Sequence, residues 1–174
     1  CDELSYDTEN GAEVNARKST GSKISTRRKI ASKGTSVVSR GSHRLKNGTS
    51  NFCKGNAMTL MEVKAMLDAG NDAIESISDC EKSPVHIIAL GEIGIGNTTT
   101  AAALYSALLR SRGITPEQVC GKGTGLDDAG VQRKVNIVRR ALDYHATVIE
   151  KGDIMNIMAA LGGAEIVALV GAIN

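Results

Sequence analysis

The residues best suited to chemistry in this chain of 174 residues form a glycine-rich turn between two apolar stretches. Residues 85–90 read Val-His-Ile-Ile-Ala-Leu, residues 91–96 contain three glycines, and residues 97–100 read Asn-Thr-Thr-Thr before an alanine-rich stretch. This order predicts a strand, a turn and the start of a helix. Such a turn binds anions because its backbone N–H groups and the helix dipole point toward the same place. We call residues 91–96 the first glycine loop and expect it to bind phosphate.

The spacing of the first glycine loop resembles that of a Walker A loop, with one important difference. Gly91, Gly96 and Thr98 match, whereas Asn97 stands where Walker A has the lysine that binds phosphate. Without that positive charge a triphosphate is poorly matched, while N–H groups and hydroxyls suffice for a single phosphate. A purely structural role, with glycines for close packing and threonines as a helix cap, is the alternative. The density of small and hydroxyl residues favours binding.

A second glycine loop, residues 121–125, also precedes a helical pattern. If the two loops face one ligand, Lys122 supplies a positive charge and Thr124 a hydroxyl. Lys134, in the helix that follows, would add a further charge. Taken alone, Lys134 is more simply interpreted as a solvated helix lysine.

Glu92 is unusual in a loop that is expected to bind phosphate, because a carboxylate repels an anion. Its side chain is better placed against ribose hydroxyls or against a positive charge that develops during a reaction. An exposed loop glutamate without a function is the alternative.

Helical patterns flank both glycine loops. Thr59 and Glu62 have the spacing of a capping box, and apolar residues then recur at helical intervals. A helix over about residues 98–110 follows the first loop. Five of its residues are expected to be buried, namely Ala101, Ala102, Leu104, Leu108 and Leu109. Another helix follows the second loop, with Asp127 and Asp128 in its first turn, where acidic groups suit the helix dipole.

Residues 154–173 predict one or two apolar helices, broken near Gly162 and Gly163. Together with the strand over residues 85–90, the alternation of strands and helices predicts an α/β fold. We expect a Rossmann-like parallel sheet with flanking helices, of which this chain holds an incomplete part. Ligands of such sheets bind at the carboxyl ends of the strands, so both glycine loops are expected at one site.

Residues 1–45 differ from the rest in composition and are expected to be a disordered basic segment, whereas residues 46–174 form the nucleotide-binding domain. The first fifty residues hold ten Lys and Arg against five Asp and Glu, although the net charge of the chain is only +2. The basic run of residues 27–29 is interpreted as part of a solvated tail, because no aromatic residues are interleaved to stack on bases. We therefore expect no nucleic-acid partner.

Cysteine spacing and hydropathy exclude several classes of protein. Four widely spaced cysteines, without a Cys/His cluster, suggest neither a zinc site nor a disulfide framework. No apolar run approaches the roughly 20 residues that span a membrane, and no signal-peptide pattern is present. We expect a cytoplasmic protein with reduced thiols, no metal and no cofactor. The chain lacks an initiator Met and stops within an apolar helical pattern, so we expect a piece of a longer protein.

Four segments in the same order connect this chain to a known family. Residues 91–99 read Gly-Glu-Ile-Gly-Ile-Gly-Asn-Thr-Thr and closely resemble the signature loop of the nicotinate-nucleotide–dimethylbenzimidazole phosphoribosyltransferase family. Residues 48–59 are similar to its Gly-Thr-x-Asn-Phe and Ala-Met-Thr segment, and residues 121–130 to its Gly-x-Gly-Thr-Gly-Leu-Asp-Asp-x-Gly loop. Residues 161–172 resemble its Gly-Gly-Phe-Glu-Ile-Ala helix. The resemblance covers about residues 41–174.

The resemblance implies an enzyme of cobalamin nucleotide-loop assembly that is α/β, homodimeric and free of metal. It would move the phosphoribosyl group of nicotinate mononucleotide to 5,6-dimethylbenzimidazole, which gives α-ribazole 5′-phosphate and nicotinate. Residue matching assigns the nucleotide phosphate and ribose to both loops and makes Lys134 a substrate contact. With Glu92, the predicted substrate-binding residues are Gly94, Ile95, Gly96, Asn97, Thr98, Thr99, Lys122, Gly123, Thr124, Gly125 and Lys134.

Two departures from the family keep other functions open. The resemblance places the catalytic glutamate, the base that takes the benzimidazole proton, in a motif beyond Asn174, and Glu165 matches a structural position instead. Residues 1–40 have no counterpart to the part of the family that helps to form the base pocket. We therefore assign no catalytic base. A truncated or non-catalytic member that binds a nucleotide monophosphate is the alternative. A nucleotide triphosphatase is a third hypothesis, which Asn97 opposes.

Overall fold

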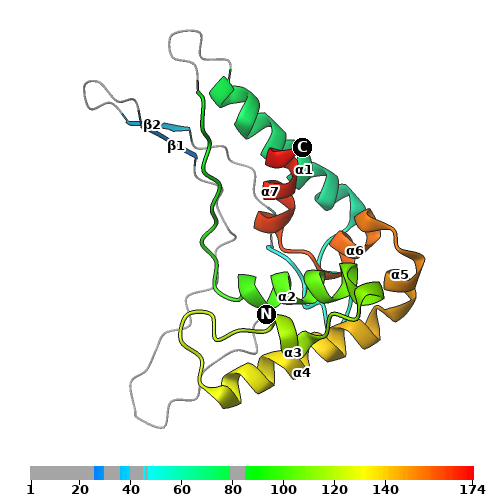
Figure 1. Cartoon of the computed structure of the whole chain (residues 1–174). Helices are drawn as coiled ribbons and strands as arrows, with labels where there is room; N and C mark the ends of the chain where they lie inside the picture. Colours follow the sequence, from blue (N-terminus) through cyan, green and yellow to red (C-terminus); the bar gives the residue numbers. More distant parts are fainter. Residues whose placement is uncertain (1–25, 30–35, 40–44, 46, 79–84) are drawn as a thin grey trace.

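The computed structural model describes residues 26–29, 36–39, 45, 47–78 and 85–174, and helices form most of the regular structure there (Figure 1). The strands are β1 (Thr26–Lys29) and β2 (Ser36–Ser39). The helices are α1 (Leu60–Ser78), α2 (Asn97–Leu108), the 3-10 turn η1 (Arg110–Arg112), α3 (Pro116–Val119), α4 (Asp128–Tyr144), α5 (Ala146–Lys151), α6 (Ile154–Leu161) and α7 (Ala164–Ile173).

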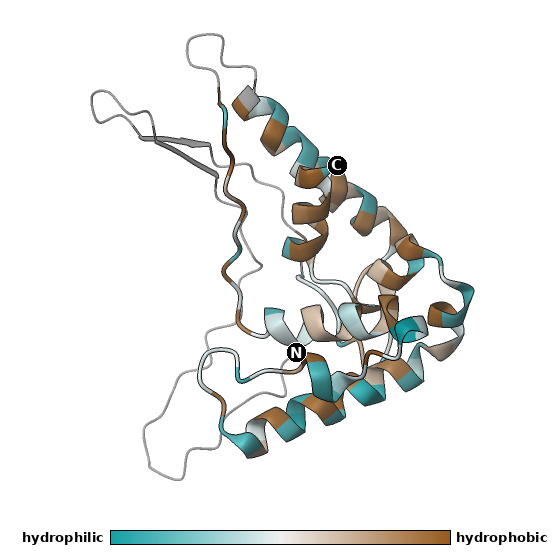
Figure 2. Cartoon of the chain, viewed as in Figure 1, coloured by the Kyte–Doolittle hydropathy of each residue, from teal (hydrophilic) through white to brown (hydrophobic). Residues whose placement is uncertain are grey.

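The predicted strand over residues 85–90 does not form among the described residues. These residues are extended, but no described strand pairs with them, and the described residues contain no parallel sheet (Figure 1). Ile87, expected in a buried strand, is 88% exposed. A strand needs neighbours to satisfy its N–H and C=O groups, and the described part of the chain brings none alongside. Figure 2 shows apolar residues along this extended segment, and the chain turns at residues 95–96 before α2.

The segment predicted to be disordered contains the two described strands. β1 and β2 form an antiparallel pair in which Arg27 lies opposite Val38 and Arg28 opposite Val37. The basic run thus lies in β1 instead of an irregular tail. The rest of residues 1–44 lies outside the described residues, as do Cys1 and Cys80. Cys53 and Cys120 are free thiols, and both are buried.

The capping box at the start of α1 is confirmed. The Thr59 backbone N–H donates to Glu62 Oε2 at 2.8 Å, and the Glu62 N–H donates to Thr59 Oγ1 at 3.2 Å. These reciprocal bonds satisfy N–H groups that have no partner within the helix. The break between the last two helices is also confirmed, since α6 ends at Leu161 and α7 begins at Ala164.

Glycines let α1 and α7 pack with their backbones in contact. A Cβ atom at Gly70 of α1 would lie 1.9 Å from the Ala168 carbonyl oxygen, and one at Gly171 of α7 would lie 2.0 Å from the Leu67 carbonyl oxygen. Any larger residue at either position must push the helices apart. Figure 1 shows the two helices side by side, rising away from α2 and α4.

Two aliphatic clusters form the core, one among α2, α4 and α6 and the other among α1, α6 and α7. The predicted burial along α2 is only partly right, because Ala101 is exposed and Leu108 is 45% exposed. α2 packs against α4 and α6, and its third face carries Ala101, Tyr105 and Leu108 at helical spacing. Within the described ranges, no helix combines the length and apolarity needed to cross a bilayer.

Candidate functional site

The first glycine loop leads directly into a helix, and the residue before this helix provides no side-chain cap. Gly96 has φ +89°, the left-handed conformation that favours glycine, and α2 begins at the next residue as predicted. No side chain of the residue before the helix caps its N-terminus. The Thr98 N–H donates to Asn97 Oδ1 at 2.6 Å, and the Thr99 N–H donates to the Gly96 carbonyl at 2.9 Å. This helix start retains the positive dipole end that suits an anion.

Glu92 folds back over the first glycine loop. Asn97 Nδ2 donates a hydrogen bond to Glu92 Oε1. The other carboxylate oxygen, Oε2, is buried and has no hydrogen-bond partner among the described residues. Burial raises the pKa of Glu92, and the negative charge of Glu165 raises it further. Glu92 therefore keeps its proton to a higher pH than an ordinary glutamate does.

The second glycine loop closes on its own backbone. Gly123 and Gly125 have φ of +57° and +116°, and the N–H groups of Gly125 and Leu126 donate to the Lys122 carbonyl at 3.2 and 2.9 Å. These bonds satisfy the donors that a phosphate would otherwise use. The loop is a tight turn that leads into α4 through Leu126.

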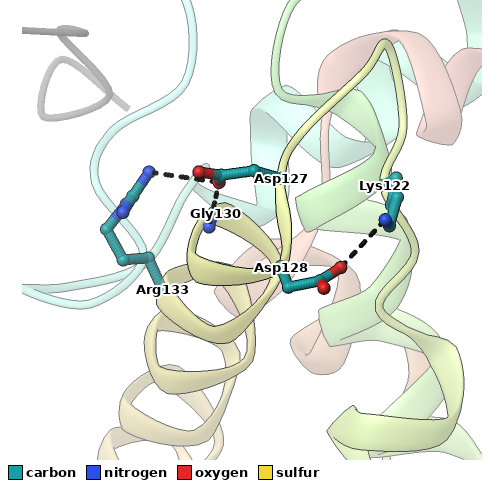
Figure 3. Close-up of polar contacts among 5 residues, drawn as sticks. All are labelled: Lys122, Asp127, Asp128, Gly130 and Arg133. Atoms are coloured by element: carbon teal, nitrogen blue, oxygen red, sulfur yellow. Dashed lines mark hydrogen bonds and ion pairs between the residues drawn. The ribbon is translucent and has the colours of Figure 1, made fainter.

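The charged side chains beside the second loop form ion pairs with one another (Figure 3). Lys122 Nζ lies 2.8 Å from Asp128 Oδ1, and both side chains are exposed. Asp127 caps α4 by accepting from the Gly130 N–H at 2.7 Å, and Arg133 lies 4.0 Å from the same carboxylate. The expectation that Asp127 and Asp128 serve the helix start is confirmed.

Lys134 joins the two loops. Its Nζ donates to Thr98 Oγ1 at 2.8 Å and to the Gly121 carbonyl oxygen at 3.1 Å, and the residue is only 4% exposed. The interpretation of Lys134 as a solvated helix lysine is thus wrong. Both acceptors are neutral, so neither of these two hydrogen bonds pairs the buried ammonium with a negative charge. A buried charge is costly unless it is paired, and an anion beside Thr98 would offset that cost.

The structure brings together part of the predicted site. A Cβ atom at Gly123 would lie 3.3 Å from Thr98 Oγ1 and 3.8 Å from Lys134 Nζ, so the second loop touches this pair directly. Glu92, Gly94 and Asn97 gather on the other side of the first loop. Ile95 is fully exposed and Lys122 is engaged with Asp128, whereas Thr99 is buried in α2. Three further predicted residues, all exposed or half-buried, lie at loop turns, namely Gly96, Thr124 and Gly125.

Sequence reasoning missed two residues, of which Glu165 lies beside the first loop. Glu165, interpreted as structural, places Oε1 4.0 Å from the Cβ position of Gly94. Its local signal is the preceding Gly163, which leaves space for a carboxylate to fold back. His145 is buried, and its Nε2 lies 2.8 Å from the Phe52 carbonyl oxygen. No local signal could reveal that contact, because the partner is distant in the sequence.

Comparisons with known proteins agree with the predicted resemblance. A family model described as phosphoribosyltransferase matches residues 11–174. The nicotinate-nucleotide–dimethylbenzimidazole phosphoribosyltransferase of Pseudomonas putida is 43% identical over 129 residues, which are 74% of this chain and 34% of the relative. Its counterpart from Photobacterium profundum is 39% identical over 128 residues, 74% of this chain and 35% of the relative.

Solved structures show the same similarity. The crystal structure of CobT from Thermus thermophilus has a TM-score of 0.62 and 40% identity, and the match covers 72% of this chain and 35% of that chain. This chain therefore spans about a third of the length of the curated relatives that it matches.

Proposed function

Since the chain belongs to the phosphoribosyltransferase family, we propose that it takes part in transferring the phosphoribosyl group of nicotinate mononucleotide to 5,6-dimethylbenzimidazole. The observation that carries this proposal is the buried Lys134, whose ammonium bridges Thr98 and Gly121 at the meeting point of the two glycine loops. A monophosphate supplies the negative charge that this ammonium lacks, and the relatives' names supply the substrates.

The proposed phosphate site consists of the first turn of α2 with Thr98 and Lys134. The helix dipole and the Thr98 hydroxyl stabilise the phosphate oxygens, and the ammonium pairs with their charge. The second glycine loop holds Lys134 in place through the Gly121 carbonyl. Thr124 and Lys122 lie at its outer edge, where the ribose side of the nucleotide would extend.

The transfer exchanges one carbon–nitrogen bond for another. The bond from ribose C1′ to the nicotinate ring nitrogen breaks, and its electron pair leaves with nicotinate. A benzimidazole nitrogen then forms a bond to C1′, and its ring proton passes to a base. Glu92 belongs to the first loop, where it can contact ribose oxygens. We assign the base to no residue of this chain.

We also propose that residues 85–90 form a strand of a parallel sheet in the complete fold. Their extended backbone and exposed apolar side chains support this arrangement, as does the similarity to structures about twice as long. Backbone groups of an extended segment need partners, which neighbouring strands would provide. A homodimer and a cytoplasmic location are proposed from the family resemblance alone.

The test is to incubate the chain with nicotinate mononucleotide and dimethylbenzimidazole and to follow nicotinate by chromatography. Nicotinate release that depends on dimethylbenzimidazole would support transfer. Binding of the mononucleotide without release would support the alternative, a member that binds nucleotide monophosphate without catalysis. A chain that neither binds nor reacts would contradict both.

A matched pair of variants shows whether the proposed phosphate site is used. Lys134→Met keeps the length of the buried side chain but removes its charge, so mononucleotide binding should weaken about tenfold or more. Lys151→Met removes an exposed lysine at the end of α5 and should leave binding unchanged. Equal binding by the two variants would refute the assignment.

A further inference from the structure

Two carboxylates approach each other across Gly94. The Cβ position of Gly94 lies 3.5 Å from Glu92 Oε2 and 4.0 Å from Glu165 Oε1. The Glu92 oxygen is the buried one without a hydrogen-bond partner. Glu165 comes from α7, a helix that begins some seventy residues later in the sequence. The absence of a side chain at Gly94 leaves the space between the two carboxyl groups open.

Glu165 lies at the start of a helix. It lies in the first turn of α7, where the helix dipole favours an acidic group. Its Oε1 is 2.7 Å from the Cβ position of Gly163, the residue before the helix, so the carboxylate folds back over the helix start. Of the two acids, Glu92 is therefore the one whose charged form is disfavoured, by its buried oxygen and by its neighbour.

The other charged groups near the loops are engaged elsewhere. Lys134 of α4 donates to Thr98 and Gly121, and Lys122 of the second glycine loop pairs with Asp128. From the first loop itself, Glu92 faces the neutral amide of Asn97. Among the described residues, the charge that acts on Glu92 is thus that of Glu165.

We propose that Glu165 is a positioning residue that acts through Glu92 and makes Glu92 keep a proton when the nucleotide binds. A protonated Glu92 donates a hydrogen bond from Oε2 to a ribose oxygen and does not repel the nearby phosphate. This inference rests on the proposed function, because the nucleotide is the ligand that it invokes. It explains why a phosphate-binding loop contains a glutamate.

The first experiment uses the ligand-free chain, so that it does not depend on the proposed function. Carboxyl carbons of glutamate are labelled with carbon-13 and titrated by NMR, and Glu92→Gln identifies the Glu92 signal. Glu92 should titrate above an ordinary glutamate, and Glu165→Gln should move its midpoint to lower pH. Glu150→Gln, an exposed change on α5, should leave the midpoint in place. An unchanged midpoint in Glu165→Gln would overturn the proposal.

A second variant moves Glu165 without removing its charge. Gly163 has φ −98°, which alanine adopts freely, but the new Cβ would lie 2.7 Å from Glu165 Oε1. Gly163→Ala should therefore displace the carboxylate and lower the Glu92 midpoint, by less than Glu165→Gln does. A midpoint that rises in Gly163→Ala would contradict the proposed contact.

The binding arm measures the affinity for nicotinate mononucleotide against pH by calorimetry. Since phosphate itself titrates near about pH 6, the variants are compared with one another. Affinity should fall as pH rises through the Glu92 midpoint, and Glu165→Gln should shift this fall to lower pH. Glu92→Gln should abolish the part of the pH dependence that comes from Glu92. If Glu165→Gln changes the affinity by the same factor at every pH, Glu165 has only a structural role and the proposal is wrong. Absence of binding by the unmodified chain would instead refute the proposed function, while the NMR titration still decides the role of Glu165.

Discussion

The two glycine loops have similar compositions but opposite local structures. The second loop satisfies its own backbone, because Gly125 and Leu126 donate to the Lys122 carbonyl and Asp127 caps the helix that follows. The first loop leads into α2 without a side-chain cap and contains a carboxylate oxygen without a partner. The first loop, which leaves the Glu92 Oε2 oxygen without a partner, is the one suited to a ligand, and the second loop supports it through the contact of Gly121 with Lys134 of α4. Glycine content alone does not distinguish the two roles.

The largest effect should come from breaking the contact between the loops. Thr98→Val keeps the shape of the side chain but removes the hydroxyl that Lys134 contacts at 2.8 Å. Hydrogen bonds to charged groups contribute about 1.5–3 kcal/mol, so mononucleotide binding should weaken roughly tenfold to a hundredfold. Calorimetric titration measures the change. Thr147→Val, an exposed change on α5, is the control and should bind normally.

A pair of glycine substitutions should separate binding from stability. Gly96→Ala places a side chain at φ +89° directly before α2, and Gly125→Ala does so at φ +116° in the second loop. Each should lower the free energy of unfolding by about 1–3 kcal/mol because of backbone strain. Urea titration gives the stability, and calorimetry the affinity. Gly96→Ala should also weaken phosphate binding in the folded protein, whereas similar affinities in the two variants would contradict the difference between the loops.

Removing the helix cap of the second loop should affect stability alone. Asp127→Ala loses the bond to the Gly130 N–H and should cost about 1 kcal/mol of unfolding free energy. Asp127→Asn retains an acceptor and should recover most of the loss. Affinity for the mononucleotide should stay within a factor of two in both variants, by the same calorimetric assay, since Asp127 faces Gly130 and Arg133.

The smallest effect concerns pH. The pKa of Glu92 is raised in the folded chain, so stability from this group is fully present below the unfolded pKa of about 4.5 and is lost as pH rises through the folded value. Glu92→Gln should remove this loss and flatten the decline of stability above pH 4.5. Urea midpoints measured from pH 4 to pH 7 compare the two proteins. A steeper decline in Glu92→Gln would show that the sign is wrong.

Local signals in the sequence predicted the helices and their caps well. Thr59 with Glu62, Asp127, and the glycine pair before α7 determine where helices start and stop, since each acts within a few residues. The strand over residues 85–90 was not found, because a strand depends on partners that the described residues do not provide. The contacts of His145 and Glu165 escaped prediction, since each joins residues far apart in the sequence, whereas Lys134 was expected near both loops because of the family resemblance.

The glycine contacts between α1 and α7 have a consequence for the chemistry of the first loop. At Gly70 and Gly171 backbone lies against backbone, so no side chain at these two points can absorb a displacement. The start of α7, and with it the Glu165 carboxylate, is therefore fixed by a surface on α1 that touches no ligand. A bulkier residue at Gly70 would move a negative charge near Glu92 and alter proton binding there. Packing between α1 and α7 thereby positions a charge that adds to the effect of burial on the acidity of a residue in the proposed site.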